Sequence, residues 1–238
     1  MAAGRNSYMG EQQAADTYFI LYDFVHSSGD DLPDPAILCA HLARIHRTTL
    51  PTKEFGFDTL RSLDGVVLEP AWDRSWADCF SRLVTTFFNH EISVNGRWPD
   101  YEAAFKDLIN RTVPRMLGRL RSKGQHITPS LVHGNLSSDN VAVRQADGMP
   151  VLFSACAMYA HNEYELGAAS LAGNGFDSAF VDQYLRTALP SEPVDEVHDR
   201  IILYGIRFRL GFSISHSTVI RESIYGDMRY LNSKYADR

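Results

Sequence analysis

The amino-acid sequence predicts an α+β fold that is mostly α-helical. Across much of the 238-residue chain, bulky apolar side chains recur every three or four positions, as they do on the buried face of a helix. In the middle of the chain the pattern changes to short apolar runs separated by turn residues, which is typical of a small β-unit. No repeat, low-complexity tract or linker divides the sequence. We therefore expect a polar N-terminal segment (residues 1–14) and one domain (residues 15–238).

Composition narrows the class of protein. The formal net charge is −6 and there is no dense run of lysine and arginine, which argues against nucleic acid as a partner. The three cysteines lack metal-ligand spacing, so neither a disulfide framework nor a zinc site is indicated. The polar N-terminus, with no run of about 18 apolar residues after it, predicts neither a signal peptide nor a membrane span. We expect a cytoplasmic protein; its oligomeric state stays open.

The first expected elements are a strand and a capped helix. Thr17–Val25 is an aromatic and β-branched run that suits a buried strand. A helix should begin at Asp34 and Pro35, because Asp accepts a backbone N–H bond at the N-cap and Pro tolerates the first helical position. We expect one face of this helix to carry Ile37, Leu38, Leu42 and Ile45.

Two longer helices are expected next. The second helix of the chain is indicated by bulky residues that fall on one stripe, which we expect to lie in the core: Trp76, Phe80, Leu83, Val84, Phe87 and Phe88. The third helix should run roughly from Tyr101 to Leu120, with Pro114 ending a turn or producing a kink.

The middle of the chain is expected to form the small β-unit. Its short apolar runs are Ser130–Val132, Val141–Val143 and Val151–Phe153, and Asp147-Gly148 is a strong hairpin signal between the last two. Helical patterns return from about Tyr164. They predict helices around Phe180–Leu185, over Val194–Ser215 after a break at Pro190–Pro193, and from near Arg221.

Two motifs carry a family resemblance. Leu131–Asn140, LVHGNLSSDN, resembles the catalytic loop of the aminoglycoside-phosphotransferase and ketosamine-kinase superfamily, which is usually written HGDxxxxN. His161–Gly167, HNEYELG, brings the resemblance closer to the fructosamine/ketosamine 3-kinases. The resemblance covers roughly residues 15–238 and includes Tyr18–Phe24, Lys53–Phe57, Gly173–Phe176 and Asp227–Leu231.

The resemblance implies a protein-kinase-like C-lobe in which a small β-hairpin unit carries the catalytic-loop motif. It also implies ATP and Mg²⁺ as cofactors of a ketosamine 3-kinase, which is a transferase. Family members have an N-lobe with a Gly-rich loop and a strand lysine, whereas about sixteen residues precede the hinge-like run here. We therefore expect the N-lobe to be largely absent, either because it was lost or because this chain is incomplete.

Catalytic and metal-binding positions depart from the family pattern. Asn135 stands where the family has the catalytic Asp, and an amide cannot act as an anionic base near neutral pH. Asn140 matches the metal-binding Asn. Ser154 replaces the second metal-binding residue, an Asp, and a neutral hydroxyl is a poor ligand for Mg²⁺. These substitutions argue against productive binding of Mg·ATP, so the cofactor of this chain stays unknown.

Other residues of the loop are candidates as well. His133 orders the catalytic loop by hydrogen bonding in the family. Asp139 is a carboxylate where the family often has Gly, so it is either a relocated acid or base or a solvated turn residue. Ser137 replaces a Trp, and Ala169-Ser170 replaces a Trp-Arg pair. We expect these changes to leave a larger and more neutral cavity for a small-molecule ligand.

A second group of polar residues lies at an expected loop-to-helix transition. His161, Glu163 and Glu165 should shape the floor of the pocket, since acidic residues favour the first turn of a helix. Besides these three, we assign Ser137, Asn140 and Ser154 to ligand binding.

Three functions remain open at this point. The first is a degenerate kinase-like protein with a remodelled small-molecule cleft. Its sequence resembles that of filamentous-fungal family members, which suggests an accessory enzyme of secondary-metabolite biosynthesis. The second is a ketosamine 3-kinase with an incomplete chain, and the third is a noncatalytic pseudokinase that binds a partner.

Overall fold

The computed structural model describes residues 21, 24–27, 32–51, 53–171, 173–216 and 218–236. The strand expected at Thr17–Val25 lies mostly outside the described residues. Leu21, Phe24 and Val25, which are described, belong to no helix or strand.

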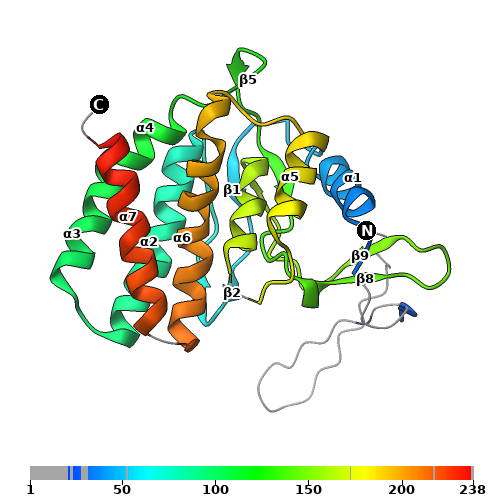
Figure 1. The fold of residues 1–238 in the computed structure, drawn as a ribbon, viewed down its shortest axis with the longest axis horizontal. Helices are drawn as coiled ribbons and strands as arrows, with labels where there is room; N and C mark the ends of the chain where they lie inside the picture. The colour runs from blue at the N-terminus through cyan, green and yellow to red at the C-terminus, as the bar shows by residue number, and fades with distance from the viewer. Residues whose placement is uncertain are drawn as a thin grey trace.

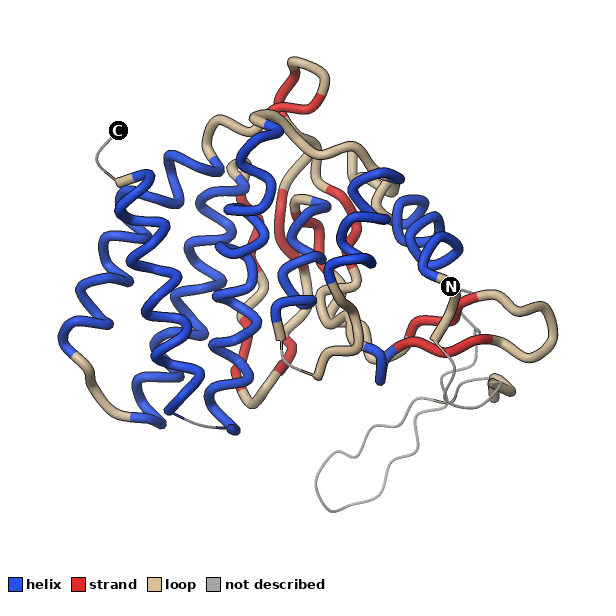
Figure 2. Tube along the Cα trace, in the orientation of Figure 1, coloured by secondary structure: helices blue, strands red, loops and turns tan. Residues whose placement is uncertain are grey.

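Most of the described chain is helical, as expected, and the larger helices pack side by side (Figures 1 and 2). The predicted stripe of six apolar residues from Trp76 to Phe88 is confirmed as core, since each member is at most 5% exposed. Among the described residues no helix is both long and apolar enough to cross a bilayer. This group of helices comprises α2 (Trp76–Asn95), α3 (Pro99–Asp107), α4 (Val113–Leu117), α6 (Val197–His216) and α7 (Thr218–Tyr235).

The predicted irregularity near Pro114 is also confirmed. A single π-helical turn, η1 (Leu108–Thr112), joins α3 to α4, and Pro114 lies in the first turn of α4. Proline has no backbone N–H, so a regular α-helix could not continue through this position without losing a hydrogen bond. The wider turn accommodates the defect while Leu108 and Val113 stay buried in the core.

A four-stranded antiparallel sheet supports the middle of the molecule, in the order β4-β1-β10-β7. The sequence indicated only β7 (Ser130–Val132) and grouped it with the hairpin further on, which was wrong. These strands are three residues each, too short to show a period of two, and they come from distant parts of the chain. The other three are β1 (Phe55–Phe57), β4 (Ala71–Asp73) and β10 (Met158–Ala160).

Three separate hairpins complete the β-structure. The predicted hairpin around Asp147-Gly148 is confirmed, with Gly148 at φ 69°, although its second strand begins one residue earlier than expected. The hairpins are β2 (Arg61–Leu63) with β3 (Val66–Leu68), β5 (Arg121–Ser122) with β6 (Gln125–His126), and β8 (Val141–Val143) with β9 (Pro150–Leu152).

A second apolar cluster lies between α1 (Pro35–Ile45), α5 (Ser178–Thr187) and the predicted catalytic loop. Asp34 caps α1 as predicted, accepting from the backbone N of Ala36 at 2.8 Å. Leu38 and Leu42 are buried in this cluster. Ile37 was placed on the same face wrongly: it is 43% exposed, because Cys39 and Ala43 complete the buried face instead.

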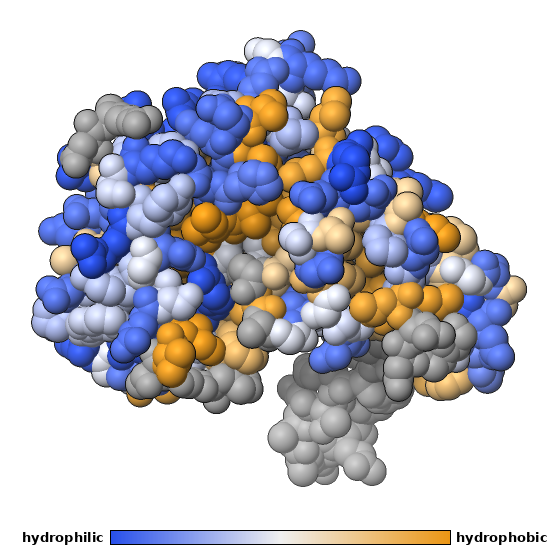
Figure 3. All heavy atoms as spheres, viewed as in Figure 1, coloured by the Kyte–Doolittle hydropathy of each residue, from blue (hydrophilic) through white to orange (hydrophobic). Residues whose placement is uncertain are grey.

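Two short 3₁₀ segments precede the long C-terminal helices. They are η3 (Asn162–Ser170), which packs on α6, and η4 (Val194–Glu196), which leads into it. The last helix begins at Thr218, three residues before the predicted start. Figure 3 shows hydrophobic side chains at the surface in the middle of the molecule. They lie between the group of large helices and the side that carries α1 and α5.

Candidate functional site

The predicted catalytic loop connects β7 to β8 and turns back through the short helix η2 (Ser138–Asn140). Its sharpest bend is at Gly134, which has a φ of 74°. A Cβ atom built there would lie 2.3 Å from the backbone oxygen of Cys156. Only glycine fits this position, because both the left-handed backbone and the close approach exclude a side chain.

Glu165 of η3 holds the start of the loop. Its carboxylate accepts from the backbone N of His133 at 2.5 Å and from the backbone N of Gly134 at 2.9 Å. The residue is fully buried, and burial by itself raises the pKa of the carboxyl. The hydrogen bond and charge of His46, together with His133, outweigh burial, so the pKa of Glu165 lies below its ordinary value. The side chain therefore acts as an anionic anchor for two backbone donors.

His133 connects the loop to the β8–β9 hairpin. Its Nε2 lies 2.7 Å from the backbone oxygen of Phe153, and its Nδ1 accepts from the backbone N of Asn135 at 3.3 Å. A carbonyl can only accept, so Nε2 is the donor in this bond, while Nδ1 is the acceptor on the loop side. This geometry is that of a residue that orders the loop, the role implied by the family resemblance. Direct participation of His133 in a reaction stays a prediction.

The loop brings the two substituted positions, Asn135 and Ser154, together with the retained Asn140. Asn135 donates from Nδ2 to the backbone oxygen of Ser154 at 3.1 Å. Asn140 donates from Nδ2 to the backbone oxygen of Asn135 at 2.7 Å. Ser154 itself has a φ of 51° and is exposed. The frame that in the family holds one carboxylate for the acceptor and one for the metal ion is thus retained, with neutral groups at both positions.

The residues present do not fit a resident Mg²⁺ ion well. The Asn140 amide nitrogen is bound to the Asn135 backbone oxygen, so the amide oxygen is the one atom of this side chain that could serve as a metal ligand. The only other side chains that the family pattern assigns to the metal and acceptor, Asn135 and Ser154, are an amide and a hydroxyl. Magnesium is bound in proteins through carboxylates together with phosphate oxygens and water. We therefore derive no catalytic step through a metal here.

The middle of the loop rests on the segment before α5. The backbone N of Ser138 donates to the oxygen of Asn174 at 2.8 Å, and Asn174 Nδ2 donates to the oxygen of Leu136 at 2.9 Å. Asp139 is exposed and Ser137 half-buried. The ligand-binding role of Ser137 and the acid-base role of Asp139 stay predictions.

His161 and Glu163 lie deeper than the predicted pocket floor. His161 is 1% exposed and lies 2.8 Å from the hydroxyl of Tyr204 and 2.9 Å from that of Ser191. Burial lowers the pKa of His161 to about 4. Glu163 pairs with the buried guanidinium of Arg200, with Oε2 and Nε 2.6 Å apart, and accepts from the backbone N of Ser191. These contacts support the chain behind the loop, and ligand contact by either residue stays a prediction.

Sequence reasoning missed His46, Tyr184 and Asn174. His46 Nε2 is 3.5 Å from Glu165, and His46 Nδ1 is 2.6 Å from the hydroxyl of Tyr184. That hydroxyl accepts from Asn162 Nδ2 at 3.0 Å. No local motif marks these residues, because each contributes through partners more than a hundred positions away or through a backbone bond. The one available signal for Asn174 was its place within the family-like segment Gly173–Phe176.

Comparisons with known proteins agree with this geometry. The family model described as fructosamine kinase matches residues 5–219. An Enterococcus faecium protein named as a ketoamine kinase is 28% identical over 208 residues, which are 87% of this chain and 68% of that protein. Mouse ketosamine-3-kinase is 28% identical over 154 residues, 64% of this chain and 46% of the mouse protein. The matched region thus spans about half to two thirds of these relatives.

Solved structures show the same fold. A protein from Thermobifida fusca named as a fructosamine-3-kinase superimposes with a TM-score of 0.67 at 18% identity, covering 89% of this chain and 69% of that one. A similarly named protein from Haemophilus somnus gives a TM-score of 0.65 at 17% identity, with 88% and 66% covered. The described architecture is therefore kinase-like, while the restriction to a C-lobe stays a prediction. With its catalytic-loop frame, its fold and the match of most of its length to the family model, the chain belongs to the fructosamine kinase family.

Proposed function

We propose that this chain is a degenerate member of its family that binds a small molecule at the face formed by Asn135, Asn140 and Ser154. Phosphoryl transfer from ATP is not its efficient activity. The observation that carries the proposal is the hydrogen bond from the Asn135 amide to the backbone of Ser154. The Asn135 amide, which stands at the catalytic position, already donates a hydrogen bond to the protein backbone. It also has no negative charge with which to accept a proton.

The size of the expected defect follows from the missing base. A positioned general base contributes about 10²–10⁴ in rate, and an amide contributes none of it near neutral pH. Replacing a magnesium carboxylate by the Ser154 hydroxyl weakens the charge compensation that phosphoryl transfer requires. Each loss alone would leave a slow kinase; together they support a binding function or a different reaction at the same face.

The retained loop supports this reading over simple decay. Gly134 keeps its left-handed bend, and Glu165 keeps both backbone donors bound even though the groups that the loop would position have changed. A preserved frame with neutral groups suits a ligand less charged than Mg·ATP. The suggested role as an accessory enzyme of fungal secondary-metabolite biosynthesis is part of this proposal and rests on the resemblance alone.

A ketosamine 3-kinase with an incomplete chain is the second candidate. It is favoured by the relatives named as ketoamine and ketosamine kinases, and by the fact that the match covers 46% of the mouse protein. If the rest of such a protein were supplied, Asn140 and the ordered loop would still be in place.

One experiment separates these functions. The purified chain is titrated with Mg·ATP by calorimetry and is incubated with labelled ATP and fructoselysine, while a metabolite library is screened by thermal shift. The proposal expects stabilisation by a small molecule and phosphate transfer at least about a hundredfold below that of an intact relative assayed in parallel. Transfer at the relative's rate would establish the kinase instead. No stabilisation by nucleotide or metabolite would favour a noncatalytic partner-binding protein.

A further inference from the structure

A broad surface groove runs between α3 and α7, two helices on the side of the molecule away from α1 and α5 (Figure 1). It holds about 630 Å³, and most of the residues along it are exposed. Its walls include Asp100, Ala103 and Asp107 of α3 and Gly226, Arg229 and Tyr230 of α7. An open groove between two helices suits a third helix better than a small molecule, which needs an enclosed site.

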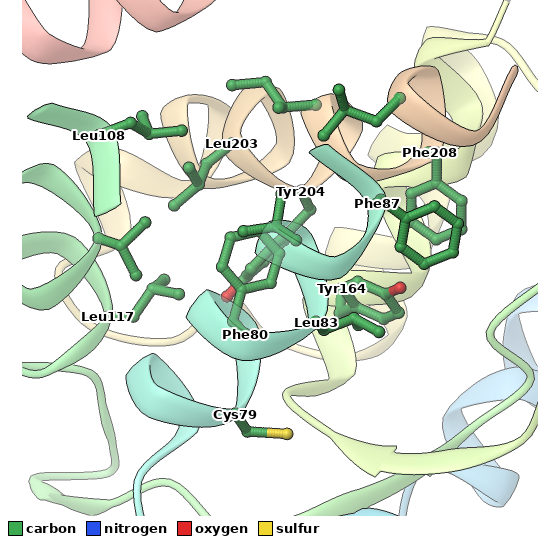
Figure 4. Packing of buried hydrophobic residues seen from close by; sticks show 14 of the residues in the cluster. Cys79, Phe80, Leu83, Phe87, Leu108, Leu117, Tyr164, Leu203, Tyr204 and Phe208 are labelled. Atoms are coloured by element: carbon green, nitrogen blue, oxygen red, sulfur yellow. The ribbon is translucent and has the colours of Figure 1, made fainter. Parts of the chain in front are cut away.

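The groove is a surface feature and not a gap in the core. Figure 4 shows Leu108 and Leu117, which follow α3 in the chain, in the apolar core with Leu203 of α6. Beneath the groove, Asn232 of α7 donates from Nδ2 to the backbone oxygen of Ala104 at 2.9 Å. The two helices are therefore held to each other and to the core, while their outer faces stay exposed.

Gly226 leaves the α7 wall of the groove without a side chain. It lies in the interior of an 18-residue helix, where glycine is less favourable than alanine. A Cβ atom built there meets nothing within 4 Å, whereas one built at Gly167 or Gly211 meets Tyr204 or Asp64. No contact within the described chain requires glycine at position 226. Its absent side chain instead lets a helix from outside approach α7 closely.

α3 and α7 run in the same direction. Near the start of α3 the ring centres of Trp98 and Tyr225 are 4.8 Å apart, and further along both helices Asn232 binds Ala104. Arg229, three residues before Asn232, therefore lies level with the middle of α3.

Charges of both signs line the groove. Asp100 and Asp107 are roughly 10 Å apart along α3, on either side of the level of Arg229. All three side chains are exposed, and none takes part in the ion pairs found among the described residues. The guanidinium of Arg229 lies 5.7 Å from the ring centre of Tyr225 instead. The groove is thus acidic along α3 and basic at one point of α7.

We propose that this groove is the interface of a homodimer, in which a second copy of the chain lays its α7 antiparallel along it. A two-fold axis close to Arg229 brings Arg229 of each copy opposite the acidic α3 of the other, so that every charge pair forms twice. This self-complementarity is what selects a second copy as the occupant. Exposed tyrosine and arginine, which are enriched in interfaces, lie at its centre. The inference concerns a different face from the proposed small-molecule site and does not rest on it.

The first test is the mass of the full chain in solution. Sedimentation velocity over a concentration series should show a species of one chain converting to a species of two chains. Because the expected pairs are exposed at their rims, high salt should shift the equilibrium toward the single chain. A single chain at every concentration overturns the proposal and leaves a helix of a different protein as the occupant. Assemblies larger than two chains contradict a closed two-fold interface.

Charge reversal tests the pairing across the axis. Arg229→Glu and Asp107→Arg should each weaken self-association at least about tenfold, because like charges then face each other twice. An equal mixture of the two variants should dimerise again, since every pair in the mixed dimer has opposite signs. Asp107 is used because Asp100 also stabilises the first turn of its own helix. Lys106→Glu is the matched control on the same helix outside the groove, and it should dimerise like the wild type. A mixture that stays dissociated contradicts the two-fold arrangement.

Gly226→Gln separates association from folding. Glutamine is a better helix former than glycine and has open space at this position, so the Tm of the dilute, dissociated chain should rise. The same side chain fills the groove and should prevent the dimer. These opposite changes could not arise from a damaged fold, which would lower the Tm. A Gly226→Gln chain that dimerises like the wild type overturns the interface. No measurement here uses ATP, Mg²⁺ or a metabolite, so this inference and the proposed function can fail separately.

Discussion

The side-chain amide of Asn135 donates a hydrogen bond to the backbone oxygen of Ser154, with 3.1 Å between Nδ2 and O. This bond joins the catalytic loop to the end of the β8–β9 hairpin, at the two positions where the family places acidic residues. An aspartate could not make it, because a carboxylate has no hydrogen to donate and would repel the carbonyl. The neutral substitution is therefore part of how this loop is held.

Asn135→Asp combined with Ser154→Asp should reverse this relationship. Without metal the double variant should lose about 1 kcal/mol or more of unfolding free energy, because one hydrogen bond is lost and two like charges face each other. Mg²⁺ should restore the lost stability, and the left-handed φ of 51° at Ser154 is tolerated by Asp. Denaturant unfolding with and without Mg²⁺ measures both effects.

The same variant also separates metal binding from phosphate transfer. We expect it to gain Mg²⁺ binding without gaining phosphate transfer to fructoselysine. Full recovery of transfer would show that the two neutral residues were the only defect. Asn135→Ala, which removes the bond without adding charge, should lose stability and show no response to Mg²⁺.

Glu165→Gln should weaken the support of the loop. The carboxylate accepts two backbone donors on different oxygens, whereas glutamine has a single acceptor oxygen. One buried N–H of His133 or Gly134 is then left unpaired, at a cost of about 1–3 kcal/mol. Hydrogen exchange should speed up at these two amides before it does in α2. Unchanged protection there would mean that the strands, not Glu165, hold the loop.

His161 should make stability depend on pH. Its native pKa of about 4 lies below the ordinary value of 6.5, so on acidification the unfolded state binds the proton first. The stability is therefore complete above about pH 6.5 and decreases as the pH falls toward 4, by up to about 3 kcal/mol. Unfolding free energies at pH 4.5 and 7 measure the slope. His161→Gln should flatten it, whereas substitution of the exposed His126 should not.

Breaking the Glu163–Arg200 pair should lower the unfolding free energy more than replacing both residues with apolar ones. Both side chains are completely buried, and Arg200 also donates to the backbone oxygens of Ser191 and Pro193. Glu163→Ala leaves an uncompensated cation and should cost about 3–5 kcal/mol. Glu163→Leu with Arg200→Met should cost less than Glu163→Ala.

An exposed ion pair serves as the control for that comparison. Arg97 is largely exposed where it pairs with Glu102, so Arg97→Ala should change the unfolding free energy far less than Glu163→Ala does. A double-mutant cycle measures the coupling in each pair. Equal coupling energies at the buried and exposed sites would contradict the expectation.

Local patterns were sufficient where a residue's own neighbours decide its structure. The spacing from Trp76 to Phe88 gave α2, Asp34 gave the start of α1, and Asp147-Gly148 gave the hairpin. The prediction that Ile37 is on the buried face was wrong because two adjacent faces of α1 are both apolar, and only the position of α5 decides which one is covered. The central sheet was not predicted for a related reason, because each strand is too short for its sequence to show the two-residue alternation of a strand.

Within the site, the sequence by itself determined the loop frame and the loss of negative charge at Asn135 and Ser154, because residue identity fixes what can ionise or donate. Only the tertiary structure decided that Glu165 anchors the loop, and that Glu163 pairs with a completely buried Arg200. Burial and partners come from segments that folding brings together, and these set the energy of a charged group more strongly than its sequence neighbours do.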